Sequence, residues 1–286
     1  MKKLYHFSAL IGTHTRILKT WGVFLSFLLI VSGFGHSVFA QEMVVKTFIS
    51  SGTWTVPAGV TEITVEAWGA GGGGGGSTQH QQGGSGGGGG AYAKGQLSVT
   101  PGDSISVDVG QGGNGGNNEN GASGGESKVN TIVAGGGSGG EGDRGIAGAG
   151  GTAQGGSINT SGAGGTTGGN SGGAGGAGAN GGAGGAGSTN EAGGRGLSPG
   201  GGGGGGEAAV IDFVFFQIPL PQPGGSGANG HVIISYIPGY RAEISEPLIS
   251  SNIWEIGEER TISVDLKNTG QATWTSDVEL GIRWSD

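Results

Sequence analysis

The chain has 286 residues, of which 75 are glycine, and it contains no cysteine. Its formal net charge is −8 and its isoelectric point is about 5.1. Glycine at roughly four times its usual share excludes an ordinary globular composition. The missing thiols exclude disulfides and zinc–thiolate sites, and the acidic balance argues against nucleic acid as a partner.

The first forty residues have the pattern of a secretory signal peptide. Positively charged residues precede an apolar run over Val23–Val31, and small residues before Gln41 suit cleavage after Ala40. The apolar run is too short and too interrupted for a membrane span of about 20 residues. We therefore expect residues 1–40 to be removed, which predicts a secreted or cell-surface protein with no transmembrane anchor in this segment.

Short β-strands flank and interrupt the glycine. They are indicated by β-branched and aromatic residues of alternating polarity, and turn signals at Pro57–Gly59 and Thr100–Asp103 separate several of them. The expected strands cover residues 44–50, 53–56, 63–68, 91–99, 104–109, 128–134 and 230–236. They predict an all-β fold over residues 41–239, namely a small β-sandwich with glycine-rich insertions.

The glycine block shows a three-residue period. From Gly169 to Gly187 every third residue is glycine, and another register reads Ala174, Ala177, Asn180, Ala183 and Ala186. A polyproline II backbone has three residues per turn and no internal hydrogen bonds, so its polar groups need neighbouring chains, which approach closely only where Cβ atoms are missing. We expect one continuous polyglycine II helix from Gly172 to Gly187. The alternative is a flexible linker, and the absence of proline there disfavours a collagen helix.

An apolar run, Ala208–Pro223, interrupts the glycine. At a loop tip it would form an exposed hydrophobic patch, the usual mark of a binding surface. Folded back, it would be a buried strand or plug. The candidate contact residues are Phe213, Phe215, Phe216, Ile218 and Leu220.

Residues suited to catalysis or metal binding are scarce. His80 and His231 are the two histidines after residue 40, and they lie in unlike contexts without a partner motif. Asp143 ends a segment that approaches the Gly-Gly-x-Gly-x-Asp calcium pattern, but with the acid one place early and without repetition. The sequence therefore predicts no catalytic residue, no metal site and no cofactor, and we expect a protein that is not an enzyme.

Four motifs in order resemble the glycine-rich domain family of phage tail-fibre and bacterial secreted proteins. They are Phe48–Gly72, Thr100–Gly113, Gly124–Val129 and Gly227–Tyr236. The resemblance implies a β scaffold that carries polyglycine II strands packed side by side. In the tail-fibre relatives it further implies terminal loops that contact a host receptor.

Residues 240–286 resemble the start of an Ig-like bacterial surface module of the CARDB kind. The segment Thr261–Gly270 alternates in polarity like a strand, and the resemblance rests on Lys267–Gly270, Thr273–Trp274 and Leu280–Trp284. Too few strands are present to close a sandwich. We therefore expect a truncated domain and a longer natural protein.

Together these features predict a secreted or cell-surface, non-enzymatic adhesin or ligand-binding protein. Its partner would be an unknown surface ligand, such as a glycan or a cell-surface protein. One alternative is a structural component of an extracellular matrix or stalk. Another is an ice-binding protein, because bundled glycine helices resemble an insect antifreeze fold and residues such as Ala174 and Ala177 would form a flat face.

Overall fold

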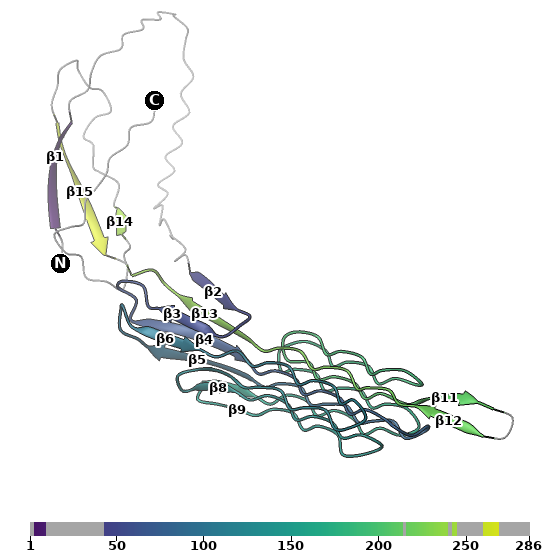
Figure 1. Cartoon of the computed structure of the whole chain (residues 1–286). Helices are drawn as coiled ribbons and strands as arrows, with labels where there is room; N and C mark the ends of the chain where they lie inside the picture. Colours follow the sequence, from purple (N-terminus) through teal and green to yellow (C-terminus); the bar gives the residue numbers. More distant parts are fainter. Residues whose placement is uncertain (1–2, 10–42, 214–215, 240–241, 245–259, 269–286) are drawn as a thin grey trace, which may run out of the picture. The chain divides into compact units, whose positions relative to one another are not determined.

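The computed structural model describes residues 3–9, 43–213, 216–239, 242–244 and 260–268. They form two compact units, the main unit Met43–Gly239 and a terminal unit from the two ends of the chain. All regular elements within these ranges are β-strands, which confirms the predicted all-β class (Figure 1). Across the same ranges there is no helix with the length and hydropathy needed to cross a membrane.

The terminal unit contains one antiparallel sheet in the order β1–β15–β14. Its strands are β1 (Lys3–Ala9), β14 (Ala242–Ile244) and β15 (Arg260–Asn268), and β15 matches the alternating segment predicted there. β1 lies within the residues that we expect to be removed. The apolar run at 23–31 and the motifs at 273–284 fall outside the described residues, so the signal peptide and the Ig-like module stay predictions.

The main unit contains several small antiparallel sheets at one end (Figure 1). The largest has the order β10–β5–β4–β13–β2, so the strand before the glycine region pairs with the strand that closes it. Its strands are β2 (Val44–Phe48), β4 (Glu62–Trp68), β5 (Tyr92–Ser98), β10 (Ile158–Thr160) and β13 (His231–Tyr236). The smaller sheets are β3 (Gly52–Thr55) with β6 (Ser104–Val107), and β7 (Ser127–Val129), β8 (Ile132–Ala134) and β9 (Ala153–Gln154).

One apolar core joins these sheets. β4 alternates buried and less buried residues and contributes Ile63, Val65 and Ala67, as its sequence pattern predicts. β13 adds Val232 and Ile234 from the same sheet. The smaller sheets cover this core with Trp54, Ile105, Val107, Val129, Ile132 and Ala134.

Residues 128–134, predicted as one strand, are a hairpin. β7 and β8 pair with Val129 opposite Ile132, and Asn130 between them has a φ of 49°. Asparagine tolerates this left-handed backbone better than most residues, which suits it to a tight turn. The alternation of polarity continues through the turn, so the sequence pattern does not show that the chain reverses direction there.

The glycine segments run side by side away from the sheets, without strand or helix assignment (Figure 1). In segment 69–77 the backbone hydrogen bonds change partner with a three-residue period. The N–H groups of Gly69 and every third residue after it donate to segment 85–91. The N–H groups of Ala70 and every third residue after it donate to segment 119–125. Those of Gly71 and every third residue after it donate to segment 222–228.

The carbonyl groups of the same segment accept hydrogen bonds from three further segments, 113–116, 137–143 and 203–206. Segment 69–77 is therefore hydrogen-bonded to six neighbouring segments, three that accept its N–H groups and three that donate to its carbonyl groups. Segments 83–91 and 200–206 likewise bond to six neighbours each. Every residue of these three segments is buried, so the interior of the glycine region consists of backbone.

This close packing explains the need for glycine. A Cβ atom added to Gly73 would lie 2.0 Å from the carbonyl oxygen of Asn114, and one on Gly74 would lie 2.1 Å from that of Gly204. Both distances are far below van der Waals contact. At Gly169, by contrast, an added Cβ would have no heavy atom within 4 Å.

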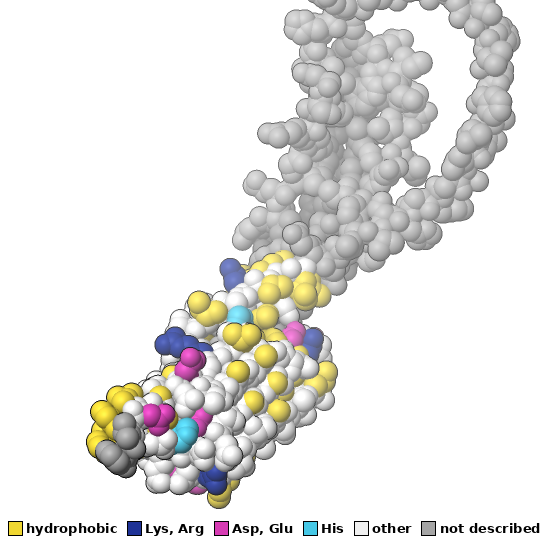
Figure 2. Space-filling view, turned by 90° about the vertical axis from the view of Figure 1, so that its right-hand side faces the viewer, with side chains coloured by type: hydrophobic (Ala, Val, Ile, Leu, Met, Phe, Trp, Pro, Cys, Tyr) yellow, Lys and Arg dark blue, Asp and Glu magenta, His cyan; other side chains and the backbone are white. Residues whose placement is uncertain are grey.

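The continuous helix expected from Gly172 to Gly187 is instead two antiparallel arms. The chain reverses at Ala179–Asn180, where Asn180 has a φ of 47°, and Gly175 donates across to Gly185 at 2.8 Å. In both arms the glycines face neighbouring backbones. The third register of the two arms is exposed and includes Ala174, Ala177, Ala183 and Ala186. Figure 2 shows small hydrophobic side chains spaced regularly over the glycine region.

Candidate functional site

A two-stranded hairpin ends the main unit on the side away from the larger sheets (Figure 1). It consists of β11 (Ala209–Asp212) and β12 (Gln217–Leu220), with Ile211 opposite Ile218 and Ala209 opposite Leu220. Beyond the strands, Phe213 and Phe216 exchange two backbone hydrogen bonds of 2.9 and 3.3 Å. The apolar run 208–223 therefore forms a protruding hairpin.

One face of this hairpin is apolar and exposed. Side chains on a strand alternate between its two faces, so every second residue shares a face, and directly opposed residues lie on the same face. The set that we call the hairpin face is Ile211, Phe213, Phe216, Ile218 and Leu220, each between 41% and 58% exposed. The rings of Phe213 and Phe216 stack, with centroids 4.8 Å apart, and Figure 2 shows hydrophobic side chains gathered at this end.

The structure thus places four of the five predicted contact residues on one exposed face. The alternative, a buried strand, is not what the described residues form. Phe215 lies outside them. Ile211 was not among the predicted residues, although the alternation of apolar residues on either side of positions 214–215 was the signal that could have identified it.

A buried carboxylate fixes the base of the hairpin. Glu207 is 1% exposed, and its two oxygens accept backbone N–H groups from Gln81 at 3.1 Å and Asn190 at 2.9 Å. His80 Nδ1 lies 3.5 Å from the same carboxylate. Because hydrogen bonds to a charged group are stronger than neutral ones, Glu207 ties the first hairpin strand to two loops.

The second strand is anchored through its backbone. Just after β12, Gln222 exchanges hydrogen bonds of 2.9 and 3.0 Å with Ser77, the last residue of a buried glycine segment. Both strands of the hairpin are therefore held where they leave the glycine region. Such anchoring lowers the entropy that the hairpin would lose on contact with a partner.

Two adjacent charged residues hold the neighbouring loops together. Asp143 accepts the N–H and the hydroxyl of Thr78, at 2.9 and 2.7 Å, and Arg144 donates to the carbonyl of Gln81 and the side chain of Asn170. Asp143, the acid of the calcium-like pattern, thus bonds within the protein. The described part of the chain contains no group of three or more His, Asp or Glu residues that could hold a metal ion.

The remaining polar cluster lies on the five-stranded sheet. Tyr92 donates its hydroxyl to Glu66 at 2.6 Å, and Lys94 donates to the other carboxylate oxygen at 3.1 Å. Burial raises the pKa of Glu66, but these two donors outweigh it and bring the pKa below its ordinary value. Burial and the same hydrogen bond raise the pKa of Tyr92.

His231 packs edge-on against Trp68, with ring centroids 5.8 Å apart. Burial lowers the pKa of its imidazole, because the charged form loses hydration there. No described carboxylate is paired with it. Its surroundings are those of a packed strand residue.

No curated protein matches the chain. The family described as "Glycine-rich domain" matches residues 46–237, about two thirds of the sequence, from the first strand of the main unit to the strand that closes it. The chain therefore belongs to the glycine-rich domain family.

Proposed function

We propose that this protein is a secreted or cell-surface, non-enzymatic adhesin that uses the hairpin face to contact a surface ligand. The observation that carries the proposal is the exposure of five large apolar side chains on one face of an anchored hairpin. Each of these side chains is about half exposed, so leaving it in water forgoes roughly half of the 1.5–3 kcal/mol that full burial of such a side chain contributes. Contiguous exposed apolar patches commonly mark interaction sites.

The glycine region acts as the scaffold in this proposal. We infer that its segments are polyglycine II helices, and the three-residue period of their hydrogen bonds supports this. A segment bonded to six neighbours resists bending because any displacement breaks several hydrogen bonds at once. The hairpin is then presented at a fixed distance from the sheets.

The proposed ligand is a cell-surface protein or glycan with an apolar face. Stacked aromatic side chains suit both, because they offer a flat apolar surface at low cost in conformational entropy. The loops held by Glu207 and Asp143 would lie beside the bound ligand as its polar surroundings. These loop residues would set the choice of ligand.

The double substitution Phe213→Ser and Phe216→Ser in the full chain tests the proposal. We expect cell or glycan-array attachment to fall at least about tenfold, with an unchanged melting temperature, since hot-spot aromatics contribute 2 kcal/mol or more. The matched control, Ile146→Ser with Ile158→Ser, also removes two exposed apolar side chains and should leave attachment unchanged. Unchanged attachment in the Phe variant would contradict the proposal, and so would a large drop in its melting temperature, which would make the hairpin a structural element.

Localisation is tested separately. We propose export by residues 1–40 with cleavage after Ala40. Intact mass of the exported protein should correspond to a chain that begins at Gln41. Charged substitutions in the apolar run 23–31 should retain the protein inside the cell.

A stalk or matrix component is the second candidate, and the backbone packing of the glycine region favours it. In that case stiffness is the function, and the Phe213→Ser/Phe216→Ser variant would assemble into the matrix normally. Substitutions in the buried glycines would abolish assembly. The two variants together distinguish an adhesin that presents the hairpin face from a stalk or matrix component that only needs a stiff glycine region.

Ice binding is the third candidate, supported by the exposed alanine register of the two arms. It predicts thermal hysteresis in the full chain and its loss in an Ala177→Lys/Ala183→Lys variant. A reading of zero for the unmodified protein would dismiss it.

A further inference from the structure

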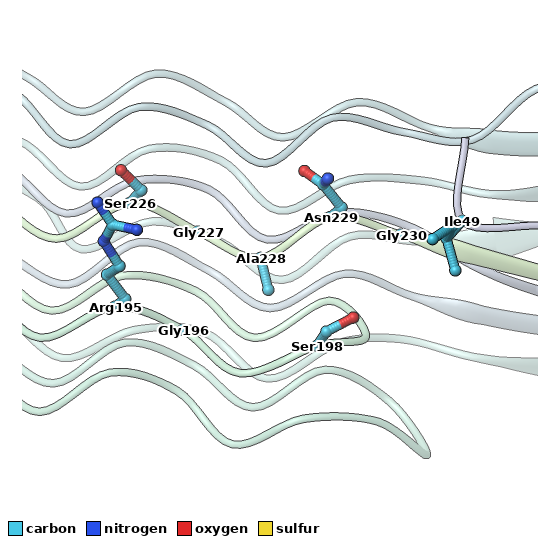
Figure 3. Close-up of a pocket in the computed structure, with 9 residues that line it drawn as sticks. All are labelled: Ile49, Arg195, Gly196, Ser198, Ser226, Gly227, Ala228, Asn229 and Gly230. Carbon is cyan, nitrogen blue, oxygen red and sulfur yellow. The ribbon is translucent and has the colours of Figure 1, made fainter. Parts of the chain in front are cut away.

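A second surface feature of the main unit is an open groove along the glycine region (Figure 3). It follows two neighbouring segments, 195–198 and 226–230, joined by a 3.0 Å hydrogen bond from the Gly196 N–H to the Ser226 carbonyl. Its volume is about 460 Å³, within the range of small-ligand sites. The side chains that line it are those of Ile49, Arg195, Ser198, Ser226, Ala228 and Asn229.

The floor of the groove is bare backbone. A Cβ atom on Gly196 would lie 1.9 Å from the carbonyl oxygen of Gly201, and one on Gly227 would lie 2.1 Å from that of Gly71. Both positions therefore face inward, and neither residue can carry a side chain that would block the groove. The groove is kept open by the same packing that builds the glycine region.

Arg195 supplies the one positive charge among the lining residues. Lys94 pairs with Glu66, and Arg144 donates to loop groups, whereas Arg195 makes no side-chain hydrogen bond or ion pair within the described residues. Its side chain is exposed and reaches toward Ser226 (Figure 3). A guanidinium in this state is available to a carboxylate, which it binds through two parallel hydrogen bonds.

Neutral hydrogen-bonding groups continue along the groove. The hydroxyls of Ser198 and Ser226 have no partner in the part of the chain that the structure covers. Asn229 uses its amide oxygen to accept the Gly112 N–H at 2.8 Å, which leaves its NH₂ group as a donor. Because Ser226 and Asn229 are three residues apart, their Cα atoms are separated by about 10 Å at most.

The backbone along the groove is partly in use. The N–H groups of Gly196, Gly227 and Ala228 all donate to neighbouring segments. Those of Arg195, Ser198, Ser226 and Asn229 have no acceptor among the described residues. Along each segment these free groups recur at every third residue, whereas an extended peptide added as a strand would need them at every second one. These free N–H groups and the side chains can both donate to sugar hydroxyls, and the three-residue spacing does not suit an added strand, which favours a saccharide over an extended peptide.

We propose that this groove binds an acidic oligosaccharide, that is, a short chain of sugar units that carry carboxylates. Arg195 would hold one carboxylate, and the hydroxyls of Ser198 and Ser226 with the Asn229 amide would hydrogen-bond to sugar hydroxyls. Ile49, which is 70% exposed, and the Ala228 methyl would contact the apolar face of a sugar ring. The site is separate from the hairpin face and does not depend on its function.

Calorimetric titration of the full chain at low salt tests the proposal, with trigalacturonate as the acidic probe and maltotriose as the neutral one. We expect trigalacturonate to bind with a dissociation constant below about 1 mM and maltotriose at least tenfold more weakly. Arg195→Gln should weaken trigalacturonate at least tenfold. Lys128→Gln, an equal change of charge outside the groove, should leave it unchanged.

A second variant keeps the charge and fills the space. Ala228→Leu should block trigalacturonate while Arg195 is retained, and circular dichroism melting should show both groove variants folded like the unmodified chain. Equal binding by the unmodified chain and Arg195→Gln would overturn the proposal. So would tighter binding of inorganic phosphate, which indicates a simple anion site, or of a triglutamate peptide, which indicates a peptide site. The Phe213→Ser/Phe216→Ser variant should still bind trigalacturonate, so failure of the hairpin proposal is distinguishable from failure of this one.

Discussion

Strand β4 and segment 69–77, which directly follows it, both contribute to the buried interior, but β4 buries apolar side chains and the segment buries backbone. β4 places Ile63, Val65 and Ala67 in an apolar core, whereas segment 69–77 buries almost nothing except its own backbone. The first arrangement gains from removing apolar surface from water. The second gains from hydrogen bonds of about 1 kcal/mol net each and from close backbone contact.

The two arrangements differ in what they tolerate. A side-chain core accepts changes of similar size and shape with modest loss, since neighbouring side chains can shift. A backbone core has no side chains that could shift. Fixing glycine also costs more conformational entropy than fixing any other residue, so each glycine segment is stable only when its neighbours are in place.

We expect the largest loss of stability when a single methyl group is added inside the glycine region. Gly73→Ala places a Cβ 2.0 Å from the Asn114 carbonyl oxygen, so segments must separate and lose hydrogen bonds. We expect a loss of about 4 kcal/mol or more in the free energy of unfolding, measured by urea denaturation. The control Gly169→Ala, where nothing lies within 4 Å, should change it by less than about 0.5 kcal/mol. Equal effects of the two substitutions would remove the distinction between the regions.

In the sheets the loss of a large side chain is the matching test. Ile234→Ala removes a fully buried side chain from β13 and should cost about 3 kcal/mol. Ile234→Val, which keeps most of the volume, should cost about 1 kcal/mol. This graded response, measured by the same denaturation, is what the glycine region should lack.

The base of the hairpin should respond less to mutation. Glu207→Gln retains the size of the side chain but replaces one acceptor oxygen by a donor that faces a backbone N–H. We expect a loss of about 2 kcal/mol and faster chymotrypsin cleavage at Phe213 and Phe216. Glu191→Gln, an exposed acid in the neighbouring loop, serves as the control. Identical cleavage rates in both variants would mean that Glu207 does not hold the hairpin.

The smallest effects are those of pH, and they belong to the sheets. The pKa of His231 is lowered from its ordinary value of 6.5, so the unfolded chain takes up a proton first and stability falls as the pH drops below that value. Glu66, with a pKa below its ordinary 4.5, adds stability that is lost as the pH falls through its folded pKa. We expect the unfolding free energy, measured from pH 7 to 3, to decline less steeply in His231→Phe than in the unmodified chain above pH 5. In Glu66→Gln the decline should be less steep than in the unmodified chain below pH 5.

The sequence predicted the sheet end better than the glycine end. Alternation of polarity located β2, β4 and β13 because each strand buries one face, a property that a few neighbouring residues reveal. The reversals at Asn130 and Asn180 were missed because their surroundings continue the local pattern on both sides. Composition alone showed that glycine was required, but not which segments lie inside.

The parts that escaped prediction depend on contacts between distant residues. Glu207 bonds to Gln81, which is 126 positions away, and its partners are backbone groups that carry no sequence signal. Four residues of the hairpin face were named from the sequence as contact candidates, since long apolar runs are conspicuous in glycine, and their role in binding stays a prediction. Whether that run would be exposed depended on where the surrounding segments end.

The three-residue period also governs how the length of the glycine region can change. With the polyglycine II geometry that we propose, adding one triplet to every segment keeps each N–H opposite its present type of partner and moves the hairpin about 9 Å farther from the sheets. Adding one or two residues to a segment rotates the residues after the insertion, so that alanine methyl groups that are now exposed would point at neighbouring backbones. Homologues and engineered forms should therefore differ by multiples of three residues within segments, while their turns vary freely, so the reach of the molecule changes in fixed steps.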